Sequence, residues 1–227
     1  MRDAKRMKGA SLARAACLSV GLVIGPSIAV AQAAPPLDVR SESVDAAFLA
    51  GVKIQSSGTL VEARQVQDVK GRHVLVLTRT VGPSREQPAA REGRIDLRVT
   101  YYDEQPSGWQ EAWAIKDFVD CPDLDMMGRF LTRGLSVTDL DRNGVAEVTV
   151  PYMTFCGGGV DPGVLKIILR QGGTKFALRG ENEIPIPGYA SDGGRYTPDK
   201  DLLLPGNTMF MRHLDKVWQQ VKVVELE

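Results

Sequence analysis

RIDLRVTYY, residues 94–102, decides the fold of this chain. Apolar residues at positions 95, 97, 99 and 101 alternate with polar ones at 96, 98 and 100, which is the pattern of a β-strand with one buried face. On either side lie HVLVLTRT (73–80), a largely apolar run, and EAWAIKDF (111–118), in which Trp113 and Ile115 share a face. Short strands of this kind, separated by turn signals, favour an antiparallel sheet.

A hairpin and a helix follow further along the chain. The segments 164–170 and 174–179 flank Gln171-Gly172-Gly173, a hairpin signature. Residues 44–49 are candidates for a short helix, and a longer one is indicated behind Asn207, a candidate N-cap. Its apolar stripe at helical spacing is Phe210, Leu214, Val217, Trp218 and Val221. We therefore predict a mainly β (α+β) fold, an antiparallel sheet or sandwich with a C-terminal amphipathic helix packed on it.

The stretch before this helix is irregular. Residues 182–206 carry four prolines and four glycines, so they cannot form regular structure throughout. A loop of this length in a compact domain is either functional or disordered. Tyr189 and Tyr196 within it could stack on a sugar ring, and the alternative is that they pin the loop to the sheet.

The N-terminus has the pattern of a secretory signal peptide. A basic head is followed by an apolar run over 17–31 and by Ala31-Gln32-Ala33, which predicts cleavage after Ala33 or after Ala31. The apolar run is shorter than the roughly 20 residues that span a bilayer, and a retained anchor is the alternative. We predict a signal peptide over 1–33, a linker over 34–43 and a single globular β-rich domain over 44–227, with no transmembrane anchor after cleavage and a periplasmic or secreted location.

Charge and cysteine usage agree with export. Lys+Arg and Asp+Glu both number 28, but the head holds five of the basic residues and one of the acids, so the exported chain carries a net charge of about −4. It has no basic stripe, which argues against nucleic-acid binding. Cys121 and Cys156 then remain, and in an oxidising compartment a pair predicts a disulfide. Two buried thiols or a reactive nucleophile are the alternatives.

The segment SVTDLDRNGVAEVTV (136–150) has the spacing of a calcium loop. With Asp139 as position 1, oxygen-bearing side chains stand at positions 3 (Asp141), 5 (Asn143) and 9 (Glu147). The glycine at position 6 allows a sharp turn, and the backbone carbonyl of Val145 at position 7 can add a ligand. Calcium prefers six to eight such hard oxygens. The alternative is a set of Asx-turns that cap a hairpin without metal, and magnesium fits less well because it keeps its own waters.

This loop is not an EF-hand. Position 12 is Val150, where an EF-hand needs a bidentate glutamate. The flanking residues alternate like strands, so the loop should join two antiparallel strands. It resembles the D-x-[DN]-x-[DN]-G-x-x-[DE] loops of FG-GAP and VCBS repeats. With about three acidic ligands, we expect a dissociation constant for calcium of about 10⁻⁴–10⁻³ M.

A longer resemblance covers residues 113–180. The segments WAIKDFVDCP, LSVTDLDRNGVAEVTVPY, CGGGVDPGVLKIIL and KFALRG resemble, in order and spacing, a family of small exported bacterial proteins labelled surface-polysaccharide biosynthesis proteins. The family pattern has an acid directly before the valine after the second cysteine. Here that position is Gly159, and Asp161 follows two positions later, so a ligand role there does not carry over. The resemblance implies a cell-envelope setting and no established reaction.

Catalytic motifs are scarce in the sequence. His73 and His213 stand at no metal-binding spacing and read as packed or solvated histidines, and no G-x-S-x-G elbow occurs. Four acids over 117–125 could include a glycosidase pair, with a solvated edge as the alternative; they are Asp117, Asp120, Asp123 and Asp125. We therefore predict a non-enzymatic, calcium-binding exported domain that acts in or on the bacterial cell envelope and binds surface polysaccharide or another envelope component. The alternative is a carbohydrate-active enzyme of glycoside hydrolase type that uses carboxylates of the 117–125 loop.

Overall fold

A computed structural model describes residues 38–89, 92–159 and 161–224. The predicted signal peptide and the first residues of the expected linker lie outside the described residues. The described residues all belong to Pro36–Glu227, one of the two units into which the chain divides by its internal contacts.

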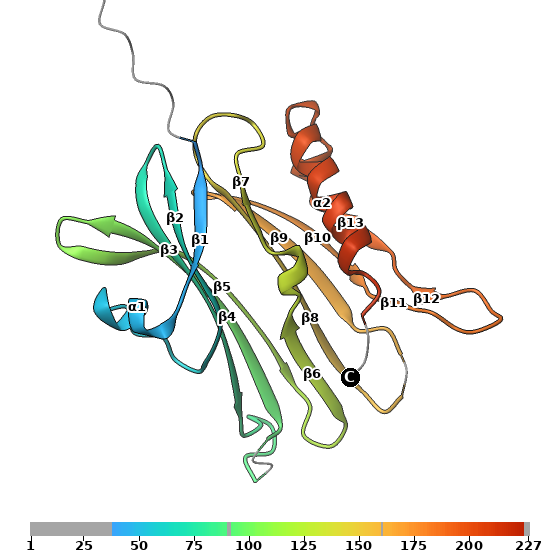
Figure 1. Cartoon of the computed structure of the whole chain (residues 1–227). Coiled ribbons are helices and arrows are strands. Elements are labelled where there is room, and N and C mark those ends of the chain that lie inside the picture. The colour runs from blue at the N-terminus through green and yellow to red at the C-terminus, as the bar shows by residue number, and fades with distance from the viewer. Residues whose placement is uncertain (1–37, 90–91, 160, 225–227) are drawn as a thin grey trace, which may run out of the picture. The chain divides into compact units, whose positions relative to one another are not determined.

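The first sheet is five-stranded and antiparallel, in the order β1-β2-β3-β4-β5 (Figure 1). Its strands are β1 Arg40–Val44, β2 Thr59–Asp68, β3 Gly71–Gly82, β4 Arg94–Gln105 and β5 Gly108–Asp120. The segment RIDLRVTYY forms most of β4, and its apolar residues Ile95, Leu97 and Val99 are buried. The strand prediction for this segment is therefore confirmed.

The second sheet has the order β13-β10-β9-β8-β6, and β7 also pairs with β8. Its strands are β6 Asp125–Phe130, β7 Ser136–Thr138, β8 Glu147–Gly157, β9 Val164–Gln171, β10 Thr174–Glu181 and β13 Tyr196–Pro198. β9 and β10 pair around Gly172 and Gly173, which confirms the predicted hairpin. Two short strands, β11 Glu183–Ile184 and β12 Asp192–Gly193, form a separate pair.

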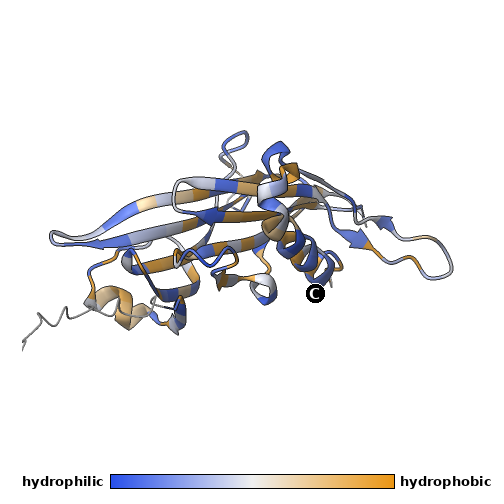
Figure 2. Cartoon of the chain, turned by 90° about the horizontal axis from the view of Figure 1, so that it is seen from above, coloured by the Kyte–Doolittle hydropathy of each residue, from blue (hydrophilic) through white to orange (hydrophobic). Residues whose placement is uncertain are grey.

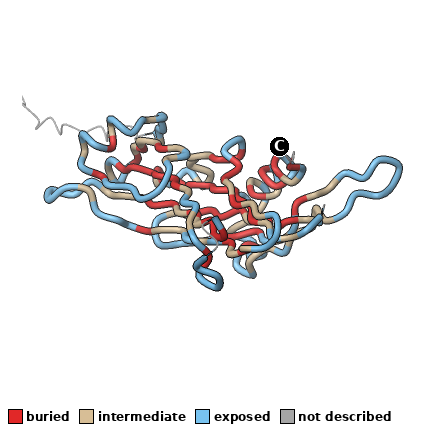
Figure 3. The backbone as a smooth tube through the Cα atoms, turned by 90° about the horizontal axis from the view of Figure 1, so that it is seen from below, coloured by how far each residue is buried: buried red, intermediate tan, exposed pale blue. Residues whose placement is uncertain are grey.

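The two sheets face each other across the main hydrophobic core. That core joins residues such as Leu75 and Val99 of the first sheet to Val150 and Ile168 of the second. Side chains on the other face of the second sheet, such as Ile167, belong to another core beneath the C-terminal helix. Hydrophobic residues recur along the strands of both sheets and along α2 (Figure 2), and the buried residues are concentrated in these same elements (Figure 3). The second sheet is therefore buried on both faces.

The C-terminal helix, α2 Thr208–Val221, buries its predicted apolar stripe against the second sheet. This confirms the predicted mainly antiparallel β fold with a C-terminal helix packed on it. Asn207 stands at the N-cap, but its side chain donates to the Asp201 carbonyl at 2.8 Å and makes no cap bond. Three 3-10 turns complete the described chain: η1 Thr132–Gly134, η2 Lys200–Leu203 and η3 Pro205–Asn207. Among the described helices, none has the length and apolar character to cross a membrane.

The N-terminal boundary of the domain differs from the prediction. The linker expected over 34–43 ends earlier, because β1 pairs with β2 from Arg40 onward. The short helix α1 Ala46–Gly51 starts later than expected, since Val44 is still in β1 and Asp45 caps the helix through Phe48 N at 2.9 Å. β1 is almost wholly exposed, so no apolar alternation marks it, and backbone pairing holds it at the edge of the sheet.

Candidate metal centre

The acidic loop lies between β7 and β8, as its flanks predict. Thr138 pairs with Glu147 at the base of this antiparallel hairpin. Gly144 has φ +79, and a Cβ there would lie 2.4 Å from Cγ1 of Val69. Glycine is therefore required at position 6 by both the backbone conformation and the packing. The Gly144 carbonyl also accepts from Val69 N at 3.0 Å, so this turn is fixed against the β2–β3 turn of the first sheet.

Three carboxylates converge inside the loop. One oxygen each from Asp139, Asp141 and Glu147 lie within 4.8 Å of one another. Oδ1 of Asp139 is buried and has no hydrogen-bond partner within the described part of the chain. Three negative groups at this spacing repel one another unless a proton or a cation lies among them. The unsatisfied oxygen is thus an acceptor that a cation could satisfy.

Asx-turns also shape the loop. Asp141 Oδ1 accepts from Asn143 N at 3.2 Å, and Asn143 Oδ1 accepts from Val145 N at 2.7 Å. Asp139 Oδ2 accepts from Gly144 N at 3.0 Å. The turn bonds expected without metal are therefore present, and they occupy only one oxygen of Asp139. Turn formation and metal ligation are compatible in this loop.

Glu147 is the most buried of the three acids, with 0 % of its surface exposed. It accepts hydrogen bonds from Leu140 N at 2.7 Å, from Thr138 Oγ1 at 3.1 Å and from a third donor on β9. Burial raises the pKa of Glu147 to about 7, and the nearby Asp141 and Asp139 carboxylates add to the rise. The hydrogen bonds from Leu140 and Thr138 act in the opposite direction but are outweighed.

The donor on β9 is Gln171, which the loop's own spacing could not reveal. Its Nε2 donates to Asp141 Oδ2 at 3.1 Å and to Glu147 Oε1 at 2.8 Å. Gln171 stands opposite Glu147 in the β8–β9 register, directly before the Gly-Gly turn. If its amide turned over, Oε1 would face the carboxylates as a further hard oxygen ligand. The side chains gathered here therefore fit a hard cation such as calcium.

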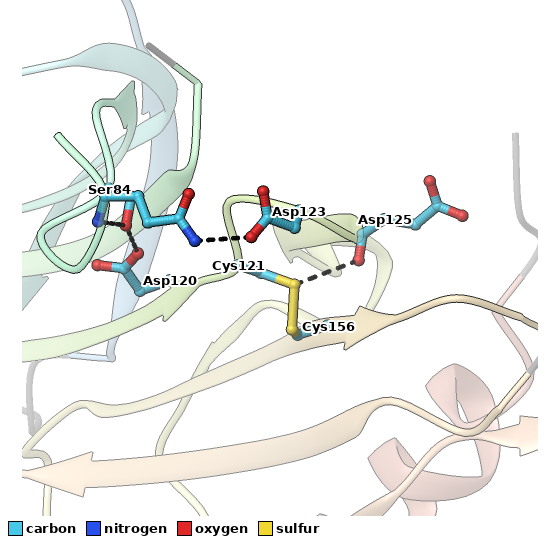
Figure 4. The surroundings of a disulfide bond; sticks show 7 residues. Ser84, Asp120, Cys121, Asp123, Asp125 and Cys156 are labelled. Atoms are coloured by element: carbon cyan, nitrogen blue, oxygen red, sulfur yellow. Dashed lines mark hydrogen bonds between the residues drawn. A yellow bond between two sulfur atoms is a disulfide. The ribbon is translucent and has the colours of Figure 1, made fainter. Parts of the chain in front are cut away.

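The predicted disulfide is present at the other end of β8. The sulfur atoms of Cys121 and Cys156 are 2.07 Å apart and their Cα atoms 5.7 Å apart. The bonded Sγ of Cys121 lies 3.8 Å from the Asp125 carbonyl oxygen. This is a contact without a hydrogen bond, because a disulfide sulfur carries no proton. Figure 4 shows the acids Asp120 and Asp123 beside this bridge.

Three of the four acids over 117–125 make structural contacts through their side chains, whereas Asp125 is exposed. Asp117 accepts from Lys166 Nζ at 2.6 Å and from the Tyr152 hydroxyl at 2.9 Å. Burial raises the pKa of Asp117, but these two donors and Phe118 N outweigh it and lower the pKa overall. Such a shift favours a carboxylate, whereas a general acid in a glycosidase needs a raised pKa.

Asp120 and Asp123 are tied to the loop that follows β3. Asp120 accepts from the Ser84 hydroxyl at 2.6 Å and from Arg85 N at 2.9 Å, and these bonds lower its pKa. Asp123 accepts from Gln87 Nε2 at 2.7 Å. The two side chains therefore serve to hold the 83–89 segment beside the disulfide.

The two tyrosines of the irregular segment have different environments. Tyr189 is 82 % exposed in the turn between β11 and β12. The Tyr196 hydroxyl donates to Asp215 Oδ1 at 2.7 Å, and the Tyr196 ring lies 4.9 Å from that of Trp218. Tyr196 thus pins its strand to α2, whereas Tyr189 faces solvent.

The histidines are both packed. His213 Nε2 lies 3.0 Å from Thr149 Oγ1, and burial lowers the pKa of His213. His73 is 5 % exposed and lies between two aspartates, Asp68 and Asp103. The sequence shows His73 at the start of an apolar strand, but its acidic partners come from the two neighbouring strands, Asp68 from the end of β2 and Asp103 from β4.

Comparison with protein-family models, curated proteins and solved structures gave no match to this chain. The resemblances to calcium-loop repeats and to exported polysaccharide-associated proteins therefore stay predictions.

Proposed function

We propose that this chain is an exported, non-enzymatic domain that binds one calcium ion in the 139–147 loop and acts on a polysaccharide or another component of the bacterial cell envelope. The observation that carries the calcium part is the buried, unpartnered Oδ1 of Asp139 beside the carboxylates of Asp141 and Glu147. A buried acceptor without a donor is costly, and a divalent cation would satisfy it while neutralising its neighbours.

The proposed ligands are the residues that the spacing indicates. Asp139, Asp141 and Glu147 supply carboxylate oxygens, Asn143 a side-chain oxygen and Val145 a backbone carbonyl. Their hydrogen bonds to Gly144 N, Leu140 N and Thr138 Oγ1 hold the loop curled before any ion arrives. We expect a weak site of the kind found in extracellular modules, with a dissociation constant of about 10⁻⁴–10⁻³ M, because only three acids contribute charge.

The proposal that the protein is exported to the cell envelope rests on the sequence. A basic head, a short apolar run and an Ala-Gln-Ala site support export, and the Cys121–Cys156 disulfide suits an oxidising compartment. Millimolar calcium is available outside many cells, so a weak site would be filled there. Intact mass analysis of the native protein should give an N-terminus at Gln32 or Ala34, and an N-terminus at Met1 would refute export with cleavage.

The alternative, a glycoside hydrolase type of enzyme, draws less support. Its candidate acids Asp117 and Asp120 have lowered pKa values and are bound by Lys166 and by Ser84 and Arg94. Both acids therefore favour the carboxylate form. Release of reducing ends from a polysaccharide, lost in Asp117→Asn, would favour this alternative.

Calorimetric titration of the folded, chelator-treated protein tests the calcium site. Calcium should bind at millimolar or lower concentration with a stoichiometry of one, and magnesium more weakly. Asp139→Asn should weaken binding at least tenfold, because it replaces one carboxylate oxygen by an amide nitrogen and removes a negative charge. Asp192→Asn, an exposed acid in β12, should bind as the wild type does. Absence of calcium binding to the folded protein at 10 mM calcium would leave the loop as a metal-free turn.

A further inference from the structure

A cavity of about 320 Å³ opens between the two sheets beside the acidic loop. The first sheet contributes Asp68, His73, Tyr101 and Trp113, and the second sheet contributes Arg170 and the Gly172-Gly173 turn. Its volume lies at the lower end of the range for small-molecule sites, about 300–1,000 Å³. The calcium proposal uses none of these side chains.

A row of stacked groups lines the cavity. The guanidinium of Arg170 lies 5.2 Å from the ring centre of Trp113, which stacks on Tyr101 at 4.9 Å with an interplanar angle of 4°. Tyr101 in turn stacks on His73 at 5.1 Å. The three rings come from adjacent strands of the first sheet, with Tyr101 and Trp113 directly opposite in the β4–β5 register. The rings therefore hold one cation in place at one end of the row.

At the other end of the row, His73 is held by two aspartates. His73 Nδ1 lies 2.7 Å from Asp103 Oδ1, and its Nε2 lies 2.9 Å from Asp68 Oδ1. Both ring nitrogens of His73 are therefore engaged by aspartate side chains. Asp68 Oδ2 accepts from Ala146 N at 2.9 Å. Oδ2 of Asp103, whose side chain is 39 % exposed, accepts no hydrogen bond from a residue that the structure describes.

Arg170 stands out among the cations of the inner face. Lys166, on the same strand and the same face, is paired with Asp117 at 2.6 Å. Arg170 has no hydrogen bond or ion pair to any residue that the structure describes, and its Nε is buried. Burial lowers the pKa of Arg170, and no hydrogen bond or ion pair to a described residue offsets this partial desolvation. Such a cation is a ready partner for a carboxylate, which it can bind through two parallel hydrogen bonds.

Polar groups along the rest of the row complete a pattern for a sugar acid. Asp103 Oδ2 can accept from a hydroxyl group, and Tyr101 also lines the cavity. A Cβ added at Gly172 or Gly173 would meet nothing within 4 Å, so the turn leaves the entrance open. We propose that this cavity binds one carboxylate-bearing monosaccharide unit, free or at a chain end, with its carboxylate on Arg170 and its hydroxyl groups directed along the row toward Tyr101 and Asp103.

The proposed function includes binding of an envelope component, and the cavity would supply the ligand class for it. The preference for sugar acids over other anions rests on that proposed function. The calcium loop adjoins the cavity through Val145, so the binding test is run in chelator. Failure of sugar-acid binding would then leave the calcium result untouched, and the reverse also holds.

The test uses ¹H–¹⁵N NMR titration of the mature protein with D-glucuronate, D-glucose and inorganic phosphate. Glucuronate should shift the Trp113 indole signal, identified by its loss in Trp113→Phe, and the amides of Gly172 and Gly173. Glucose and phosphate should each bind at least tenfold more weakly. A glucuronate-terminated oligosaccharide, compared with the monosaccharide, shows whether the unit is taken free or at a chain end.

Arg170→Gln should weaken glucuronate binding at least tenfold. Lys175→Gln is its matched control, because Lys175 is opposite Arg170 in the β9–β10 register, is exposed and carries the same charge. It should bind as the wild type does. Equal effects of the two variants would show general charge attraction and overturn the proposal, as would phosphate binding as tightly as glucuronate. Absence of shifts at Trp113, Gly172 and Gly173 in the wild type with 20 mM glucuronate would overturn it even if Arg170→Gln did not fold.

Discussion

Asp68 joins the two sheets through Ala146: its Oδ2 accepts from the Ala146 backbone N–H at 2.9 Å. Its Oδ1 accepts from Lys70 N at 2.6 Å and lies 2.9 Å from His73 Nε2. Ala146 directly precedes Glu147 of the acidic loop. One buried carboxylate therefore connects the candidate calcium loop to the histidine that supports the inter-sheet cavity.

Asp68→Asn should destabilise the domain and weaken calcium binding. Burial raises the pKa of Asp68, but the bonds from Ala146, His73 and Lys70 outweigh it and lower the pKa overall. Replacing one oxygen by an amide nitrogen removes an acceptor from buried donors, which costs about 1–3 kcal/mol. Urea unfolding of the chelated protein measures the loss, and calorimetry the weaker affinity.

The control for this variant is Glu104→Gln, since Glu104 pairs with Arg72 on the exposed part of the sheet. Exposed ion pairs contribute at most about 1 kcal/mol, so its stability and calcium affinity should stay close to those of the wild type. If Asp68→Asn matched this control in both measurements, the proposed link between the loop and the cavity would be wrong.

Gly144→Ala should destabilise the protein for two separable reasons. The residue has φ +79, which costs an alanine about 1 kcal/mol or more, and its Cβ would lie 2.4 Å from Val69 Cγ1. Adding Val69→Ala removes the clash and leaves the backbone cost, so the double variant should recover part of the lost stability. Thermal unfolding of both variants separates the two contributions.

Gly173→Ala supplies the matched control in the neighbouring hairpin, because a Cβ there meets nothing within 4 Å. Its melting temperature should change little. If the double variant were less stable than Gly144→Ala alone, the packing of Val69 against the loop would outweigh its clash with the alanine Cβ.

The strands were predictable because burial on one face imposes a two-residue period, as in RIDLRVTYY. Strand β1 could not be predicted in this way, because its segment RSESV is exposed and shows no two-residue period of apolar side chains. The acids Asp139, Asp141 and Glu147 were found because their spacing is local. Gln171 reaches Glu147 across 24 positions and Asp68 reaches Ala146 across 78. These partners depend on strand register and sheet packing, which local spacing does not encode.

Stability without calcium should fall as the pH rises through 7. The folded-state pKa of Glu147, about 7, lies above its ordinary value of 4.5. Folding therefore favours the protonated form, and this contribution is full below pH 4.5 and lost as the pH rises through 7. The expected loss between pH 5 and pH 8 is at most about 3 kcal/mol, measured by urea unfolding in chelator. Calcium should reverse it, because the cation replaces the proton.

Glu147→Gln removes the titrating group and should flatten this part of the pH profile. His213 has a lowered pKa, so its contribution runs the other way and is lost as the pH falls below 6.5. That contribution is common to the wild type and the variant and cancels in their difference. Parallel pH profiles for the two proteins would contradict a raised pKa at Glu147.

The disulfide and the calcium loop should stabilise the domain independently. Glu147 and Cys156 lie near opposite ends of β8, Glu147–Gly157, which separates them by about 30 Å at roughly 3.3 Å per residue. Replacing both cysteines by alanine should cost about 3–4 kcal/mol for a 35-residue separation. Asp139→Ala should abolish the stabilisation by calcium. Sites this far apart are additive within about 0.5 kcal/mol, so the combined variant should show the sum of the two losses in urea unfolding with 5 mM calcium. A coupling energy well above 1 kcal/mol would mean that the two ends of β8 communicate through the sheet, and that the loop and the bridge form one cooperative site.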